Sequence, residues 1–183
     1  MRRANAILTS LIMILFLIHM IWGSLELAGF TRGGNSLFSF LSRAMILLFF
    51  FHVVISLKMT GDTILAWRRS GVSYWRENRF FWVRRISGLA LMIFIAIHVY
   101  IFSGQKVEGV YLLHFFGIME LLSQILMVVS LLVHLLTNIR PLKIAFGIED
   151  RANIRTDLIL VLAILLLLSA VAFALYYLRW LVI

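Results

Sequence analysis

Five long apolar stretches restrict what this chain can fold into. They lie near residues 6–29, 36–59, 83–103, 113–139 and 155–181. At a rise of about 1.5 Å per residue, a helix over each stretch is long enough to cross roughly 30 Å of hydrocarbon. Apolar residues make up 63% of the chain, too many for a surface that faces water on all sides. The sequence therefore predicts an all-α membrane protein with five transmembrane helices.

The rest of the chain gives no sign of a second domain. It has a single proline, 11 glycines and no low-complexity tract that could act as a linker. Residues 1–183 are therefore interpreted as one transmembrane domain. The beginning, MRR followed by an apolar run, is similar to a secretory signal, but the run continues past Trp22 without an A-x-A-like cleavage site. We therefore expect the first apolar stretch to be retained as a helix.

Basic residues gather on one side of the predicted helices. The formal net charge is +9, but Lys and Arg lie between apolar runs, where they orient helices in a bilayer, so no nucleic-acid partner is expected. One side carries the basic N-terminus and the connections 58–85 and 140–155, whereas the other has only Arg32, Lys106 and Arg179 as clear members. By the positive-inside rule, the N-terminus is cytoplasmic and the C-terminus is outside.

One histidine falls in each of the first four predicted helices. His114 lies at the outer start of the fourth, and the fifth helix has none. Counted from the nearest basic residue on the cytoplasmic side, His19 and His98 lie 16 and 13 residues along their helices, or about 20–24 Å. His52 and His134 each lie six residues along, or about 9 Å. The histidines therefore form two pairs at two depths.

Paired imidazoles in hydrocarbon favour haem. A ring nitrogen there is costly without a partner, and two imidazoles from facing helices can supply both axial ligands of one iron. A mononuclear metal site is disfavoured because the pairs are more than about 10 Å apart along the membrane normal. The chain has no cysteine, which excludes thiolate-held clusters and covalently attached haem. The pattern predicts two haems b in a bundle of the first four helices, and the alternative is four unrelated core histidines.

A family resemblance lies in VSYWRENRFFWVRRISGLALMIFIAIHVYIF, where Arg-Ile-Ser-Gly precedes His98 by ten residues counted from the glycine. The segment resembles the cytochrome b membrane subunit of succinate dehydrogenases and fumarate reductases, especially the single-chain, five-helix, dihaem type. The resemblance continues in FLIHMIW, FFFHVVISL and HLLTNIRPLKIAFGIEDRANIR and covers essentially the whole chain. Its specificity comes from the order of the histidines together with the Arg-Ile-Ser-Gly segment.

The resemblance implies roles for the histidines and for partners. His19 and His98 would bind the distal haem, and His52 and His134 the proximal haem, which lies nearer the catalytic subunits. A flavoprotein subunit with FAD would interconvert fumarate and succinate, and an iron–sulfur subunit would dock on the cytoplasmic face. This chain would anchor both in a bacterial cytoplasmic membrane and exchange electrons with a quinone, with menaquinone expected. Some members carry a glutamate two positions before the helix-four ligand, and the corresponding Leu132 makes that proton route doubtful here.

Two carboxylates are candidates for proton transfer at the quinone site. Glu26 lies seven residues beyond His19, which returns it to nearly the same helix face, roughly 10 Å farther out. Glu120 lies fourteen residues before His134, again close to one face, and Gln124 follows one turn deeper. Either carboxylate also fits a polar residue at the membrane boundary.

The basic segment 66–85 is the candidate docking surface, and its tryptophans and arginines also suit simple anchoring at the headgroups. Within it, Arg84 and Arg85 are candidates for the haem propionates or the quinone.

Three other functions fit parts of the pattern. A haem b subunit of nitrate reductase also oxidises quinol, but ligands would be expected on its last helix, where this chain has no histidine. A haem-free anchor or transporter would use the histidines as a proton relay. A stand-alone transmembrane ferric reductase would lack flavin and iron–sulfur subunits. Paired low-spin b-type absorption bands would distinguish the haem proteins from the relay.

Overall fold

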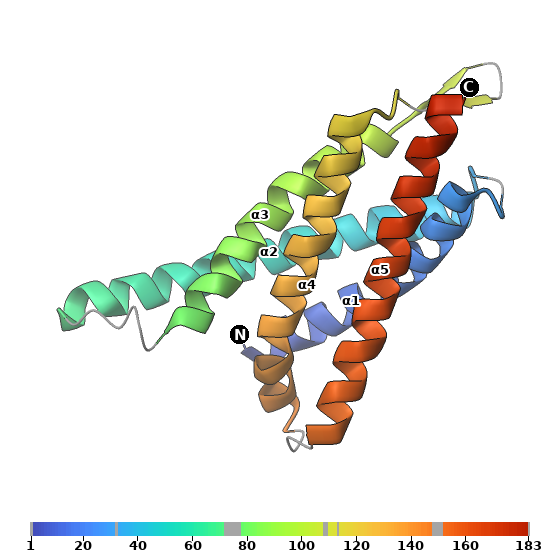
Figure 1. The fold of residues 1–183 in the computed structure, drawn as a ribbon. Helices are drawn as coiled ribbons and strands as arrows, with labels where there is room; N and C mark the ends of the chain where they lie inside the picture. Colours follow the sequence, from blue (N-terminus) through green and yellow to red (C-terminus); the bar gives the residue numbers. More distant parts are fainter. Residues whose placement is uncertain are drawn as a thin grey trace.

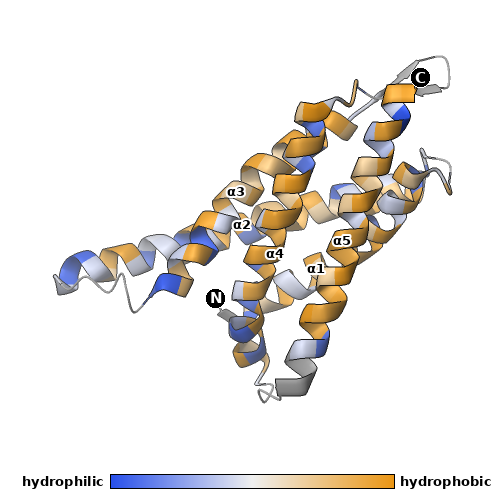
Figure 2. Cartoon of the chain, viewed as in Figure 1, coloured by the Kyte–Doolittle hydropathy of each residue, from blue (hydrophilic) through white to orange (hydrophobic). Residues whose placement is uncertain are grey.

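Five helices dominate the computed structural model, which describes residues 2–31, 33–71, 78–107, 110–112, 114–147 and 152–182. They are α1 (Arg2–Ala28), α2 (Ser36–Ser70), α3 (Arg79–Phe102), α4 (Ile118–Phe146) and α5 (Ala152–Val182). Each contains a stretch long and apolar enough to span a membrane. Apolar residues occupy the middle of the helices, and hydrophilic residues lie toward the ends of α2, α3 and α4 (Figure 2). The prediction of a helical chain with five membrane-spanning segments is confirmed at this level.

Three predicted helix ends, one on the second helix and two on the fourth, were wrong. The second helix was expected to end at residue 59, but α2 continues to Ser70 and ends at Gly71, whose φ of 66° gives the left-handed C-cap that glycine favours. The charged residues beyond the apolar run therefore do not break this helix. The fourth was expected over 113–139, but α4 starts at Ile118 and includes Pro141 before its own glycine cap. Loss of one backbone donor at a proline therefore does not end this helix. The other three helices differ from expectation by up to four residues at their ends.

A short β-hairpin between α3 and α4 was not expected. Strands β1 (Gln105–Val107) and β2 (Val110–Leu112) pair antiparallel. Strands of three residues are too short to show a reliable alternating pattern in a sequence. His114, expected at the start of the fourth helix, lies before α4, and its ring stacks on Tyr100 with centroids 5.0 Å apart.

The helices pack as two hairpins joined by α5. α1 packs against α2, α3 packs against α4, and α5 contacts both α1 and α4 (Figure 1). We call the end where α2 stops and α3 starts the basic end, and the end where α3 stops and α4 starts the far end. At the basic end, α2 projects well beyond its neighbours, toward the left of Figure 1. The buried apolar cluster of Ile101, Phe116 and Phe173 lies toward the far end.

A close contact fastens α5 to α1 at the far end. Arg179 Nη1 donates a hydrogen bond to the Leu27 carbonyl oxygen at 3.1 Å. Gly29, just after α1, has φ +86°, and an added Cβ would lie 2.6 Å from the same Arg179 nitrogen. Glycine is therefore required here both by the backbone conformation and by the approach of the guanidinium. The contact therefore fixes the far end of α5 against the end of α1.

Candidate functional site

His19 and His98 face each other across the bundle. Their ring centroids are 6.0 Å apart and their planes make an angle of 79°. One ring comes from α1 and the other from α3, which belong to different hairpins. The structure therefore brings together the two histidines that the sequence placed at the same depth.

His52 and His134 form the second predicted pair, nearer the basic end. Ser56, one turn after His52, accepts a hydrogen bond from Arg85 through its carbonyl oxygen, and His134 contacts Ser87, two residues after Arg85. His52 belongs to α2 and His134 to α4. The structure thus brings His19 and His98 into ring contact and places His52 and His134 at one level of the bundle, while the pairing of His52 with His134 and the binding of iron stay predictions.

Within the α1–α2 hairpin, each helix supplies a hydroxyl to the histidine of the other. His19 Nδ1 lies 2.9 Å from Ser42 Oγ on α2. His52 Nδ1 lies 3.3 Å from Thr9 Oγ1 on α1. Thr9 precedes His19 by ten residues, and Ser42 precedes His52 by ten residues. The antiparallel packing of the two helices therefore places two histidine–hydroxyl contacts about 15 Å apart along the hairpin.

The α3–α4 hairpin repeats this arrangement. His98 Nδ1 lies 2.7 Å from Oε1 of Gln124, whose side chain is fully buried. His134 Nδ1 lies 3.2 Å from Oγ of buried Ser87. A Cβ added at Gly88 would lie 3.2 Å from His134 Cε1, so this glycine makes room for the ring. The Ser-Gly of the Arg-Ile-Ser-Gly segment thus serves as the seat of His134.

These partners were largely missed in the sequence. Gln124 was noticed only for its place near Glu120, and Thr9, Ser42 and Ser87 were not singled out as partners. A signal was present, because each of the four helices carries a polar residue ten or eleven positions before its histidine. In two antiparallel hairpins that spacing brings each polar residue level with a histidine on the neighbouring helix.

The donor set fits an iron porphyrin better than a bare metal ion. Within the described ranges, no group of three or more His, Asp or Glu side chains is placed to hold a metal ion. The His19 and His98 ring centroids are 6.0 Å apart, close enough for both imidazoles to hold one iron. A Cβ added at Gly23, one turn from His19, would meet no atom within 4 Å, so this face of α1 is uncrowded.

Glu26 is placed as a half-buried acceptor one turn beyond Trp22. Its Oε1 accepts a hydrogen bond from Trp22 Nε1 at 2.7 Å, and the indole stacks on Phe38 with centroids 4.1 Å apart. Glu120 has a different environment, because its Oε2 accepts a hydrogen bond from the Gly117 backbone N–H at 2.9 Å. The first carboxylate is therefore held by a side chain, and the second caps the start of α4.

Arg84 and Arg85 bring two positive charges to the basic side of the His52–His134 pair. The Nε atom of each is buried and has no hydrogen-bond partner within the described residues. Arg85 Nη1 reaches the carbonyl oxygen of Ser56 at 3.4 Å, and its guanidinium lies over the Phe81 ring, 5.0 Å from the centroid. The two guanidiniums therefore keep hydrogen-bonding capacity for an anionic group.

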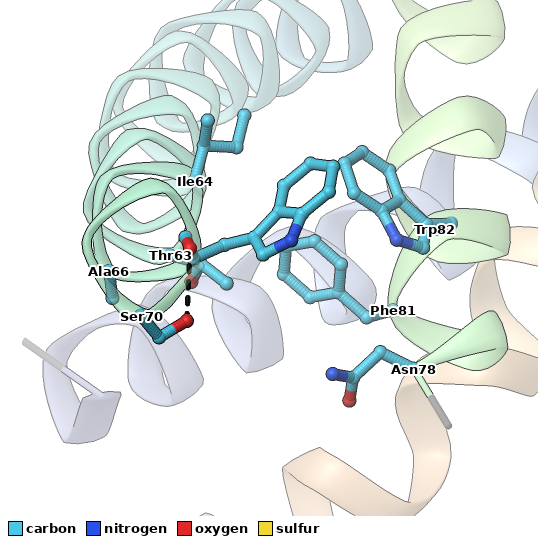
Figure 3. Close-up of a pocket in the computed structure, with 8 residues that line it drawn as sticks. Thr63, Ile64, Ala66, Ser70, Asn78, Phe81 and Trp82 are labelled. Carbon is cyan, nitrogen blue, oxygen red and sulfur yellow. Dashed lines mark hydrogen bonds between the residues drawn. The ribbon is translucent and has the colours of Figure 1, made fainter. Parts of the chain in front are cut away.

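A groove of about 330 Å³ opens at the basic end between α2 and α3. Figure 3 shows side chains from both helix ends turned toward one another around it. The rings of Trp67 and Trp82 meet edge to face, with their centroids 6.1 Å apart. Exposed Arg68 and Arg69 follow on α2. Part of the predicted docking segment 66–85, residues 72–77, lies outside the described residues. The other lining residues are Thr63, Ile64, Ala66, Ser70, Asn78 and Phe81.

No protein-family model, curated protein or solved structure matches the chain.

Proposed function

We propose that this chain is a dihaem cytochrome b that anchors a succinate dehydrogenase or fumarate reductase complex in the membrane. The observation that carries the proposal is the meeting of His19 and His98 from separate hairpins at 6.0 Å, with each Nδ1 bonded to a side chain of the neighbouring helix. His52 and His134 lie at the other level of the same bundle, where Arg85 contacts the Ser56 carbonyl oxygen and His134 contacts Ser87. The family resemblance in the sequence supports the same assignment.

The histidines would fill both axial positions of each haem. His19 and His98 would hold the distal haem, and His52 and His134 the proximal haem. When bound, the haems supply one-electron transfer without an open position for oxygen or substrate. The chain's part is to fix the two levels, to exclude water from the path between them and to orient the imidazoles through their Nδ1 contacts.

Glu26 would receive a proton from quinol near the distal level. Proton transfer requires a group within hydrogen-bonding reach of the reacting hydroxyl. Glu26 is half-buried toward the far end, and its Trp22 contact engages Oε1. Oε2 is then the oxygen for the substrate. Glu120 is the weaker candidate because its carboxylate caps α4. Menaquinone is the proposed quinone.

The basic end would receive the iron–sulfur subunit, with the flavoprotein subunit bound to it. This end carries the aromatic groove and the arginines on α2 and α3. Aromatic and arginine side chains are enriched at protein interfaces. FAD and iron–sulfur clusters would belong to the partner subunits, and the complex would lie in a bacterial cytoplasmic membrane with the N-terminus of this chain inside.

The decisive experiment is purification of the tagged chain from its own membranes, with haem, flavin and non-haem iron measured in the same sample. The proposal expects two haems b per chain with low-spin bands, together with flavin and iron. Two haems without flavin would favour a stand-alone haem reductase. A colourless chain would favour a histidine proton relay and would end the proposal.

A further inference from the structure

The four histidine contacts determine which ring nitrogen carries the proton. A neutral imidazole has one N–H donor and one acceptor nitrogen, and its tautomer follows from what its neighbours can accept or donate. Ser and Thr hydroxyls have one proton each, whereas the amide oxygen of Gln has none. The acceptor to which each hydroxyl donates its single proton therefore determines which ring nitrogen of the histidine is protonated.

In the α1–α2 hairpin, both hydroxyl protons are already used. Ser42 Oγ donates to the carbonyl four residues earlier at 2.8 Å, and Thr9 Oγ1 does the same at 2.8 Å. Each oxygen can therefore only accept from its histidine. His19 and His52 must carry their protons on Nδ1, which leaves Nε2 with a free lone pair. Ser56 Oγ lies 3.5 Å from His52 Nε2, at the outer limit of a hydrogen bond.

In the α3–α4 hairpin, Ser87 behaves in the same way, because its Oγ donates to the Arg84 carbonyl oxygen at 3.1 Å. His134 must then donate from Nδ1 to the Ser87 oxygen. The hydroxyl is thus an acceptor here too, and the seat provided by Gly88 holds the ring against it.

Gln124 fixes His98 through a chain of hydrogen bonds. Ser123 Oγ donates to the Glu120 carbonyl oxygen at 2.7 Å and accepts from Gln124 Nε2 at 3.0 Å. This order assigns the amide nitrogen of Gln124 to Ser123 and its oxygen to His98. The oxygen can only accept, so His98 also carries its proton on Nδ1.

We propose that Thr9, Ser42, Ser87 and Gln124 are positioning residues that hold all four histidines as Nδ1–H tautomers, so that each presents Nε2 to an iron. This inference rests on the proposed function. An acceptor on Nδ1–H fixes the orientation of a ligating imidazole and makes it more basic, which stabilises the ferric state. Such partners are worth about 10- to 100-fold in metal affinity.

The same contacts predict separable effects on the two haems. Thr9→Val keeps the shape of the side chain but removes the oxygen that accepts from His52 at the proximal level. Gln124→Met likewise removes the oxygen that accepts from His98 at the distal level. Each variant is expected to raise the midpoint potential of its own haem, shift that haem's low-spin EPR signal and weaken its retention about tenfold or more. The other haem should keep its potential. Thr9→Ser retains an acceptor and should restore most of the properties of the proximal haem.

Ser169→Ala is the matched control. Ser169 is buried like Ser87 and meets Ser24 of another helix at 3.3 Å, but it has no histidine contact. Its replacement should leave both haems unchanged. A shift as large as that of Thr9→Val would show general destabilisation and overturn the positioning role.

Nitrogen-15 NMR of the histidine-labelled full chain in bilayers gives the tautomers directly. In the reduced holoprotein, whose low-spin haems are diamagnetic, all four histidines are expected as Nδ1–H. If the Thr9→Val and Gln124→Met variants bind haem and keep the wild-type tautomers and midpoint potentials, this inference is overturned while the proposed function stands. A wild-type chain that binds no haem overturns the proposed function and the positioning role with it.

Discussion

The intramembrane histidines are tolerated because each ring has a cross-helix partner for Nδ1. An unpaired polar nitrogen in hydrocarbon would cost several kcal/mol, and the contacts of 2.7–3.3 Å remove most of that cost. None of the four partners is charged, so the rings stay neutral and Nε2 remains a good ligand. These partners act within one hairpin, whereas each proposed histidine pair joins the two hairpins.

Replacing His98 is expected to remove one haem and spare the other. His98→Ala deletes one of the two proposed ligands of the distal haem and leaves buried Gln124 without its partner. Haem content should fall from two to one per chain and quinol oxidation should be lost, while the soluble subunits still dock. Haem extraction and quinol-dependent reduction measure both effects. His114→Ala is the control, because His114 lies outside the helices. Retention of both haems by His98→Ala would refute this ligand assignment.

Gly88→Ala is expected to disturb the proximal haem alone. The new Cβ would lie 3.2 Å from His134 Cε1 and 3.4 Å from Nδ1, so the ring must shift. Overpacking of this kind costs about 1–3 kcal/mol. A redox titration should show a displaced proximal midpoint and an unchanged distal one.

Gly61→Ala provides the comparison for Gly88, because a Cβ at Gly61 would meet no atom within 4 Å. It should leave both haems unaffected and stabilise α2 by about 0.5–1 kcal/mol. Equal effects of the two substitutions on the proximal haem would contradict the seat assigned to Gly88.

At the scale of helices, the start of α3 concentrates positive charge beside the proximal pair. Arg84→Gln with Arg85→Gln is expected to lower the proximal midpoint, because nearby positive charge favours the reduced, less positive haem. The guanidiniums are only about half-buried, so screening limits each to about 1 kcal/mol, or roughly 40 mV for one electron.

The matched pair for that change is Arg68→Gln with Arg69→Gln, which removes two exposed arginines from the end of α2. Potentiometric titration of both double variants should show a shift only for the α3 pair. An unchanged proximal potential in the α3 variant would contradict its placement beside the haem.

The helices were predictable because apolar length alone indicates a membrane span. The end of α2 at Ser70 was not, since the polar residues past 59 are compatible with both helix and loop. The pairing of histidines by depth followed from helical rise, and the structure brings the rings of His19 and His98 together. The spacing of Ser87 before His98 was a signal in the sequence. The role of Gly88 was not visible, because a cross-helix contact depends on how the hairpins turn toward each other. Hydropathy carries no information on that rotation.

At the scale of the whole molecule, α5 acts as a brace without a histidine of its own. It packs on α1 and α4, one helix from each hairpin, and its Arg179 binds the end of α1 (Figure 1). Both proposed haem sites are shared between the hairpins, so a fixed hairpin spacing is needed for either pair to meet. α5 supplies that spacing at the far end.

The orientation of the whole molecule is testable because the chain has no cysteine of its own. Ser70→Cys at the basic end and Ser103→Cys at the far end replace exposed serines just at or beyond helix ends. The positive-inside rule places the basic end in the cytoplasm. A membrane-impermeant maleimide added to intact cells from which any outer barrier has been removed should label the Cys at 103 and not the one at 70. Opening the membrane should make both react. Labelling of position 70 alone in intact cells would show that the topology is inverted. The proposed docking surface would then lie outside, where no cytoplasmic partner could reach it.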